Sequence, residues 1–282
     1  MELEWNPENP KTEKNAVQLE MTVADDASAQ SELSVQDRTA TPPPYPGNKY
    51  GSDAYIKIIN QFPPHINFIS AFLGSCAVMR EKEPAPGANI GIEVDARTLS
   101  HYWKGYTGAK LYNYDFIAAH CSQTKYLLET HHTHELMKLP TTLVYADPPY
   151  ILDSRRNGKL YYRHELTYND HFDFIEWCKL QKCMIAISQY PHHLYDSLVE
   201  KHGWRKLEYE VMTRAGKATE CLYMNYAEPE RLHQYNYLGT DSWDRQRIKR
   251  KIAREIGKLG NLPPQERNAI IKAINKAYPY GK

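Results

Sequence analysis

The tetrapeptide Asp147-Pro148-Pro149-Tyr150 combines groups that could do chemistry together. It follows the apolar run 143–146, and a carboxylate at the end of a strand lies where ligands bind in open α/β sheets. The two prolines fix the backbone and remove two amide donors, which leaves the Pro148 carbonyl free to face a ligand. A carboxylate and a carbonyl together accept two hydrogen bonds, which suits an exocyclic NH2 group. Tyr150 adds a flat face for an aromatic ring.

The elements that must position this tetrapeptide can be read from the apolar patterning. Strands are expected at 67–72, 90–95, 110–116, 142–146, 184–190, 206–212 and 221–226, and helices over 54–62, 120–139, 168–180 and 193–202. Strands that alternate with helices predict a mainly parallel α/β sheet covered on both faces. A short polar turn with Gly216 joins the last two strands, so they are expected to form an antiparallel hairpin.

The charge distribution divides the chain into three segments. Residues 1–40 carry nine acidic side chains against three basic ones, and 1–43 is expected to be a disordered acidic tail that ends in a proline run. Residues 44–228 hold the strand and helix pattern of the main domain. Residues 229–282 are expected to form a basic helical extension, because 244–260 carries seven bases against two acids. Ile248, Ile252 and Ile256 give its first helix an apolar stripe.

Composition excludes several classes of protein. Lys and Arg number 35 against 34 Asp and Glu, mean hydropathy is −0.68, and no apolar run approaches the roughly 18 residues of a membrane span. The N-terminus has no basic and apolar leader, so no classical secretory signal is expected. Five scattered cysteines without CxxC spacing indicate reduced thiols in a cytoplasmic protein. His131, His132 and His134 fit a polar helix face better than a metal site, so no metal is expected.

Several further blocks occur in a fixed order around the tetrapeptide, at 45–49, 68–75, 92–95, 114–116, 160–165, 187–190 and 219–222. With these blocks, most of 44–228 resembles the Dam-type DNA adenine-N6 methyltransferases, which use S-adenosylmethionine. The resemblance implies a class I methyltransferase fold, a Rossmann-like sheet of seven strands that ends in the hairpin. It also implies methyl transfer to the N6 amino group of adenine in double-stranded DNA.

The resemblance assigns roles to individual residues. The catalytic residues are Asp147, Pro148, Pro149 and Tyr150, and the cofactor-binding residues are Gly47, Lys49, Phe72, Gly74, Ser75, Glu93, Asp115 and Asp147. Glu93 would take the ribose hydroxyls of the cofactor. Asp95 on the same strand end is its competitor, but Glu93 aligns with the family's acidic position.

Basic residues are expected to contact the DNA. They are Arg155, Arg156, Arg163 and His164 in the loop after the tetrapeptide, and Lys249 and Arg250 in the basic helix. Aromatic side chains alternate with the basic side chains of this loop, and such a mixture suits contacts with phosphates and nucleobases around a flipped nucleotide. A solvated charged surface is the alternative for both segments.

Two departures from the family pattern matter. Ser70-Ala71 replaces the Glu-Pro that relatives usually carry in the cofactor loop. Only the stretch 96–140 separates the second strand from the tetrapeptide strand, where members with a full target-recognition domain carry a much longer insert. The element that provides sequence specificity is therefore small or lies elsewhere in the chain.

Other functions stay open. The target could be another amino group, on cytosine N4, RNA adenine or a protein glutamine, although those classes favour Ser or Asn where Asp147 stands. The altered Ser70-Ala71 would fit a catalytically inactive DNA-binding relative. A Rossmann oxidoreductase would need GxGxxG after the first strand, and the chain has none. The sequence sets neither a DNA target site nor a companion restriction enzyme.

Overall fold

The structure is a computed structural model, and it describes residues 46–106, 110–113, 133–156, 158–213 and 216–279. The chain divides after Pro43, and the unit Pro44–Lys282 is described here by itself. The expected tail 1–43, the greater part of the helix expected over 120–139, and Asp115 lie outside the described residues.

One seven-stranded sheet forms the centre of the fold, as the sequence predicted. Its strands are β1 (Asn67–Ala71), β2 (Asn89–Glu93), β3 (Lys110–Asn113), β4 (Thr142–Ala146), β5 (Met184–Gln189), β6 (Arg205–Thr213) and β7 (Gly216–Met224). Their order is β3-β2-β1-β4-β5-β7-β6. The pairings from β3 to β5 are parallel, and β7 is antiparallel to both of its neighbours. The predicted terminal hairpin is therefore confirmed.

The strand order reverses between β1 and β4. From β1 the chain proceeds outward through β2 and β3, and it then returns to place β4 on the other side of β1. Ala71 and Ala146 are paired at the carboxyl ends of these two strands. The segments that follow them consequently leave the same edge of the sheet side by side, at the position where open α/β sheets bind ligands.

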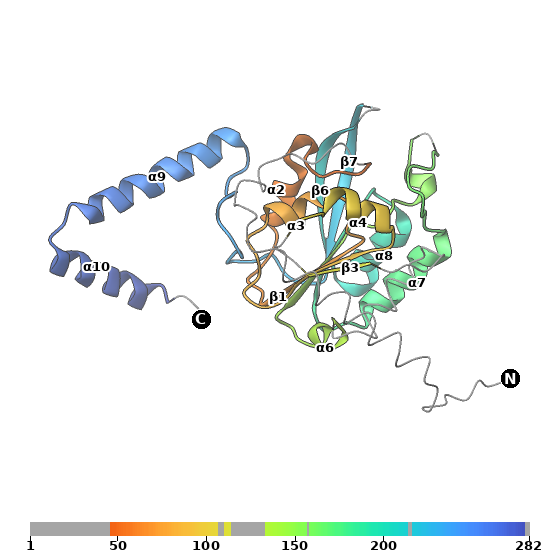
Figure 1. The fold of residues 1–282 in the computed structure, drawn as a ribbon. Coiled ribbons are helices and arrows are strands. Elements are labelled where there is room, and N and C mark those ends of the chain that lie inside the picture. The colour runs from red at the N-terminus through yellow and green to blue at the C-terminus, as the bar shows by residue number, and fades with distance from the viewer. Residues whose placement is uncertain (1–45, 107–109, 114–132, 157, 214–215, 280–282) are drawn as a thin grey trace. The chain divides into compact units, whose positions relative to one another are not determined.

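Helices cover both faces of the sheet (Figure 1). They are α2 (Ala54–Ile59), α3 (Ala77–Glu81), α4 (Ala96–Tyr102), α6 (Thr133–Met137), α7 (Tyr168–Lys179) and α8 (His193–His202), with short 3-10 turns η3 (Gly51–Asp53) and η4 (Leu152–Ser154). Local sequence explains several of the ends. Thr167 and Asp170 form a capping box at the start of α7, and Gly203 ends α8 in the left-handed conformation.

Two apolar clusters fill the space between the sheet and the helices. On one face, Phe68 of β1 packs with residues of α2 and α3. On the other face, Ile69 packs with residues of α7 and α8. Neighbouring residues of a strand point to opposite faces, and both are fully buried here. This explains why the central strands are continuous apolar runs.

Two helices follow the sheet domain, α9 (Ser242–Gly260) and α10 (Pro264–Ala277), as the sequence predicted. Asp241 caps α9 by accepting a hydrogen bond from Asp244 N, and Asn261 follows its last residue. Neither helix contains a buried residue. The Arg245 guanidinium pairs with the Asp53 carboxylate at 2.9 Å, which ties the first turn of α9 to η3. Among the described residues no helix combines the length and apolar character needed to cross a bilayer.

Candidate functional site

A cavity of about 160 Å³ opens at the edge of the sheet where the strand order reverses. It is lined by the segments that follow β1, β2 and β4, by residues 46–49 and by residues 161–164. These segments lie far apart in the sequence, and the parallel pairing of β2, β1 and β4 brings their ends together.

The loop after β1 is held in an unusual conformation. Phe72 has φ +59° and Gly74 has φ +50°, so two residues of one loop adopt the left-handed region. For a bulky residue such as Phe72 this costs about 1–3 kcal/mol. Leu73 N donates to Ile92 O at 2.8 Å and the Phe72 ring packs edge-on against Phe174, which hold the strained turn in place. The loop backbone therefore lies along the cavity wall.

Glu93 is buried at the end of β2 and joins two loops. One carboxylate oxygen accepts a hydrogen bond from Gly74 N at 2.7 Å, and the other accepts one from Asp95 N at 2.9 Å. Burial raises the pKa of Glu93, and these backbone amides oppose that shift. Glu93 also lines the cavity, so its carboxylate fixes the positions of the two loops at the cavity wall.

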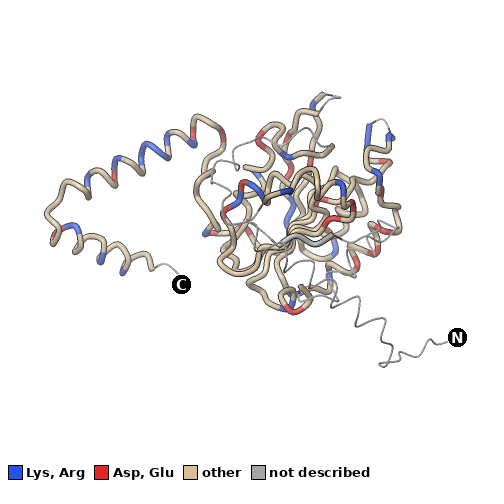
Figure 2. Tube along the Cα trace, viewed as in Figure 1, with Lys and Arg blue, Asp and Glu red and all other residues tan. Residues whose placement is uncertain are grey.

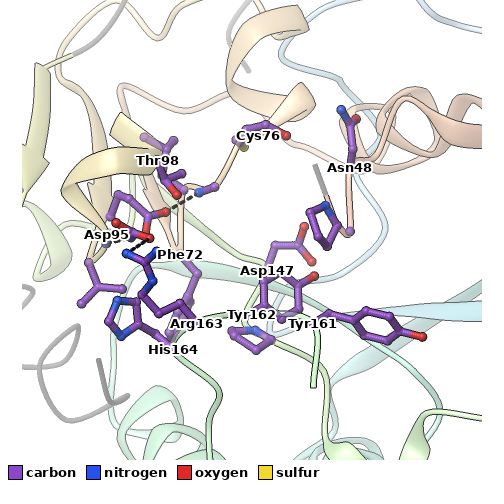
Figure 3. Close-up of a pocket in the computed structure, with 18 of the residues that line it drawn as sticks. Asn48, Phe72, Cys76, Asp95, Thr98, Asp147, Tyr161, Tyr162, Arg163 and His164 are labelled. Atoms are coloured by element: carbon purple, nitrogen blue, oxygen red, sulfur yellow. Dashed lines mark hydrogen bonds and ion pairs between the residues drawn. The ribbon is translucent and has the colours of Figure 1, made fainter. Parts of the chain in front are cut away.

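Asp95 lies on the opposite side of the cavity from Asp147 (Figure 3). Its carboxylate caps α4 by accepting from Arg97 N, and it forms ion pairs with Arg97 and Arg163 at 3.4 Å each. Figure 3 shows Arg163 and His164 next to Asp95. Both residues line this cavity, and neither lines the second cavity described below. Their predicted contact with DNA therefore stays a prediction.

Asp147, which is half-buried, forms an ion pair with the buried Lys49. The Lys49 ammonium lies 2.8 Å from each carboxylate oxygen and also donates to Gly47 O at 3.1 Å. Lys49 is 3% exposed. The residue predicted to contact the cofactor thus neutralises the predicted catalytic carboxylate. Both residues line the same cavity, and their predicted roles stay predictions.

Glu220 places a second carboxylate beside this pair. It comes from β7, is buried, and lies 3.8 Å from the Lys49 ammonium. Tyr209 of β6 donates its hydroxyl to Glu220 at 3.2 Å. Sequence reasoning assigned Glu220 no role, although its block at 219–222 was recognised. The available signal was that Glu220, an acidic residue, comes directly before the buried run 221–224 of the same strand.

Burial and neighbouring charges shift the pKa values of Asp147 and Lys49. Burial raises the pKa of Asp147 to about 6 although Lys49 opposes the shift, and the negative charge of Glu220 raises it further. The pKa of Lys49 is raised: burial lowers it, but the Asp147 and Glu220 charges outweigh that effect. Two carboxylates that share one ammonium leave the site with an excess of negative charge.

A second cavity of about 680 Å³ adjoins the first. Both are lined by residues 46–48 and by Tyr161 and Tyr162. The second alone is lined by Tyr150, Tyr190 and Glu220. The centroids of the Tyr150 and Tyr190 rings lie 4.6 Å apart, and the rings are in a T-shaped arrangement. The Lys49 ammonium lies 5.0 Å from the centroid of the Tyr150 ring. Asp147 faces the first cavity while its near neighbour Tyr150 faces the second.

Arg155 corrects a prediction made from the sequence. It was expected to contact DNA phosphates, but it is buried and its guanidinium is already bonded within the protein. It donates to Tyr150 O at 2.9 Å and to the Glu165 carboxylate at 2.8 Å. Arg155 therefore holds the segment after the tetrapeptide in place. Its neighbour Arg156 is exposed and lines the second cavity, where it remains a candidate contact.

The first cavity has features of a site for a polar ligand. The Ser75 hydroxyl is buried and makes no hydrogen bond with any described residue. Gly47 has φ +75°, and a methyl group in place of its hydrogen would collide with the Tyr162 hydroxyl. A larger residue at position 47 would be strained and would have to displace the Tyr162 side chain. Within the described ranges, no group of three or more His, Cys, Asp or Glu side chains could hold a metal ion.

Lys249 and Arg250 lie on the exposed helix α9, away from any buried surface. Pro148 is buried and Pro149 lines the first cavity. Asp115, the remaining predicted cofactor residue, lies outside the described residues.

Comparison with known proteins finds similarity only in structure. No protein-family model matches the chain, and no curated protein matches it. Similar solved structures include TrmN from Thermus thermophilus, with 12% identity over 61% of this chain and a TM-score of 0.36. Another is P. horikoshii TYW2 in complex with MeSAdo, with 12% identity over 66% of this chain and a TM-score of 0.35.

A third is M. capricolum TrmK in complex with S-adenosyl-homocysteine, with 10% identity over 79% of this chain and a TM-score of 0.37. The alignment spans 46% of TrmN, 65% of TYW2 and 95% of TrmK. Likeness at this level concerns part of the fold and carries no substrate or activity over to this chain.

Proposed function

We propose that the protein transfers a methyl group from S-adenosylmethionine to the N6 amino group of adenine in DNA. The observation that carries the proposal is the position of Asp147 at the reversal of strand order, in one of two adjoining cavities. One cavity would hold the cofactor and the other the target base. The resemblance of the tetrapeptide and its neighbouring blocks to Dam-type enzymes supports the choice of adenine.

The residues of the first cavity fit the cofactor. Glu93 and Asp95 supply carboxylates for ribose hydroxyls, and the Ser75 hydroxyl is a buried group that awaits a polar partner. The Phe72–Gly74 backbone lies along the wall, and Gly47 leaves room beside Tyr162. S-adenosylmethionine would supply an electrophilic methyl group on a positively charged sulfur.

Asp147 would act on the target amine. The lone pair of an aromatic amine is delocalised into the ring, so the nitrogen is a poor nucleophile until its N–H bonds are drawn toward acceptors. Asp147 Oδ and the Pro148 carbonyl would accept those two bonds and localise the lone pair. The nitrogen must lose one proton as it gains the methyl group, and Asp147 is the carboxylate suited to take it. Positioning supplies much of the rate.

The excess negative charge beside Lys49 also serves this reaction. Positive charge develops on the amine nitrogen as its new bond to carbon forms, and fixed negative charge in a buried site stabilises it. Tyr150 and Tyr190 line the second cavity, where aromatic stacking would hold a base that has left the duplex. Stacking of this kind is worth roughly 1–3 kcal/mol per base.

The test offers the purified full-length chain three kinds of acceptor with labelled S-adenosylmethionine: DNA, RNA and a glutamine-containing protein extract. Label on N6-methyladenine in DNA is the expected result. Label on another nucleobase or on protein would replace the proposed target while leaving the methyl transfer intact. Saturable binding of S-adenosylmethionine with no transfer to any acceptor would indicate an inactive relative.

A further inference from the structure

Helix α9 presents one face that combines arginines with an exposed tryptophan. Trp243, Arg247, Arg250 and Arg254 are separated by four, three and four residues, a spacing that places them on one side of a helix. With Ser242 and Gln246 they line a groove of about 440 Å³. Figure 2 shows basic residues along α9. We call these four residues the Trp-Arg face.

The groups on this face have little to bind within the protein. Trp243 is 76% exposed, and its indole N–H donates to no described residue. Arg250 and Arg254 form no hydrogen bond or ion pair with any residue in the described part of the chain. Arg247 pairs with Asp244 at 2.7 Å, within the same helix. Two guanidinium groups and one indole ring are therefore available to a partner.

The opposite side of α9 has a different character. Ile248, Ile252 and Ile256 recur every four residues, and Ile252 and Ile256 are 48% and 64% exposed. Lys249 and Lys251 are exposed as well, but they do not line the groove. The basic charge of α9 is thus spread around the helix, whereas the combination of arginines with an aromatic ring occurs on one face only.

We propose that the Trp-Arg face binds a single strand of DNA, with Arg250 and Arg254 on phosphates and Trp243 stacked on an unpaired base. Guanidinium groups match phosphate geometry, and an exposed indole ring offers the flat surface that bases need. An acidic polypeptide would pair with the arginines but would give the indole ring of Trp243 no aromatic ring to stack on. The choice of DNA over RNA rests on the proposed function.

The start of α9 lies close to the second cavity. Arg245, two residues after Trp243, pairs with Asp53 at 2.9 Å. Gly51, in the same 3-10 turn as Asp53, and Ala54, the residue after Asp53, line that cavity. Residues two apart on a helix lie on nearly opposite sides, so a strand that leaves the cavity would pass around the first turn of α9 to reach the Trp-Arg face. This would supply a substrate contact in a chain whose recognition insert is short.

The test uses full-length protein without cofactor and a twelve-residue oligothymidylate, which contains no adenine and so leaves the proposed target reaction aside. Affinity is measured against salt concentration. Replacing Arg250 and Arg254 with Gln should reduce the log–log salt slope by about 1.4, because each phosphate contact on a single strand contributes about 0.7. The matched control K251Q/K258Q removes the same charge from exposed positions of α9 outside the groove and should leave the slope close to that of the wild type.

Trp243 gives a second, independent readout. W243A should weaken oligothymidylate binding about tenfold at every salt concentration and leave the slope unchanged, whereas W243F should retain most of the affinity. All these positions are exposed, so circular dichroism should show unchanged helix content. Retention of the slope and tryptophan effects in a protein that methylates no adenine would uphold this inference and refute the proposed function.

Three results would overturn the inference. Equal slope losses in R250Q/R254Q and K251Q/K258Q would reveal a diffuse electrostatic attraction instead of contacts. Unchanged affinity in W243A, with polyglutamate bound as well as oligothymidylate, would indicate an acidic protein partner. Tighter binding of oligouridylate than of oligothymidylate would reassign the face to RNA.

Discussion

The Lys49 ammonium lies 2.8 Å from both carboxylate oxygens of Asp147 at the end of β4, where Lys49 is buried and Asp147 is half-buried. An ammonium in this position holds the carboxylate in one orientation. It also keeps Asp147 largely ionised at neutral pH in a site whose burial raises the pKa to about 6. The pair therefore links the orientation of the proposed catalytic group to its charge.

Replacing Asp147 with Asn should reduce methyl transfer by about 10²–10⁴-fold. Asn keeps the size of the side chain but loses the negative charge and the capacity to take a proton. Affinity for S-adenosylmethionine should change little, because Asp147 is proposed to act on the amine. Single-turnover transfer and calorimetry measure the two effects separately. Turnover near that of the wild type would show that the catalytic centre lies elsewhere.

Methyl transfer should depend on pH with an acid limb near pH 6. Asp147 accepts hydrogen bonds as a carboxylate, so activity should rise as pH increases through its folded-state pKa of about 6. Stability should change in the opposite direction. The pKa lies above the ordinary value of 3.8, so between these values the folded state binds more protons than the unfolded state and this group's contribution to stability falls as pH rises.

The same titration tests the role of Glu220. Its negative charge raises the pKa of Asp147, so Glu220→Gln should move the acid limb to lower pH. Gln can still accept the Tyr209 hydroxyl, which keeps this contact in the variant. The pH–rate profile of single-turnover transfer measures the shift. An unmoved limb with reduced overall activity would indicate that Glu220 only supports the local structure.

Glu93→Ala should weaken S-adenosylmethionine binding more than Asp95→Ala does. A hydrogen bond to a charged acceptor contributes about 1.5–3 kcal/mol, and Ala also removes the acceptor that holds Gly74 N. Asp95 is partly engaged by Arg97 and Arg163. Calorimetry on both variants decides between them, with thermal unfolding as the control for loop damage. A larger affinity loss in Asp95→Ala would assign the ribose contact to Asp95.

Arg155→Gln should destabilise the fold by about 3 kcal/mol, because it removes the buried guanidinium that joins the half-buried Glu165 carboxylate to Tyr150 O. Arg156→Gln is the matched control. The Arg156 side chain is exposed, so this substitution should change the free energy of unfolding by less than about 0.5 kcal/mol. Denaturant unfolding measures both. Equal stability of the two variants, combined with weaker DNA binding by Arg155→Gln, would restore the original prediction for Arg155.

Removing residues 1–40 should leave methyl transfer unchanged. The segment precedes every block that resembles the family, and its nine acidic residues against three basic ones disfavour contact with DNA. A modest gain in the DNA association rate is expected at low salt. A large loss of turnover in the shortened chain would place the start of the catalytic domain before residue 44.

The central sheet could be predicted because its strands are short apolar runs between polar segments. The strand 142–146 and the helix 193–202 have the predicted ends, since charged or turn-forming residues bound them. Helix α2 ends at Ile59 although the apolar pattern continues to Phe62. Phe62 is fully buried, so tertiary packing extends the apolar pattern beyond the helix itself.

The candidate site was harder to predict where it depends on contacts between distant segments. Glu93 ends β2, Asp147 follows β4 and Gly74 lies in the loop after β1, so the local sequence marks all three positions. Glu220 reaches Lys49 only because β7 runs antiparallel beside β5, and no local pattern shows that approach. Arg155 is one of several basic residues that lie close together in the sequence. The sequence does not show which of these arginines points inward and pairs with Glu165.

The reversal of strand order between β1 and β4 also governs how the site is assembled during folding. The first half of the sheet supplies the loop after β1 and the end of β2, whereas Asp147 comes from the second half. Pairing of β1 with β4 joins residues 75 positions apart and is a slow, long-range event. A ligand in the first cavity touches both halves, so it stabilises only the complete sheet and would favour its cooperative unfolding as a single unit.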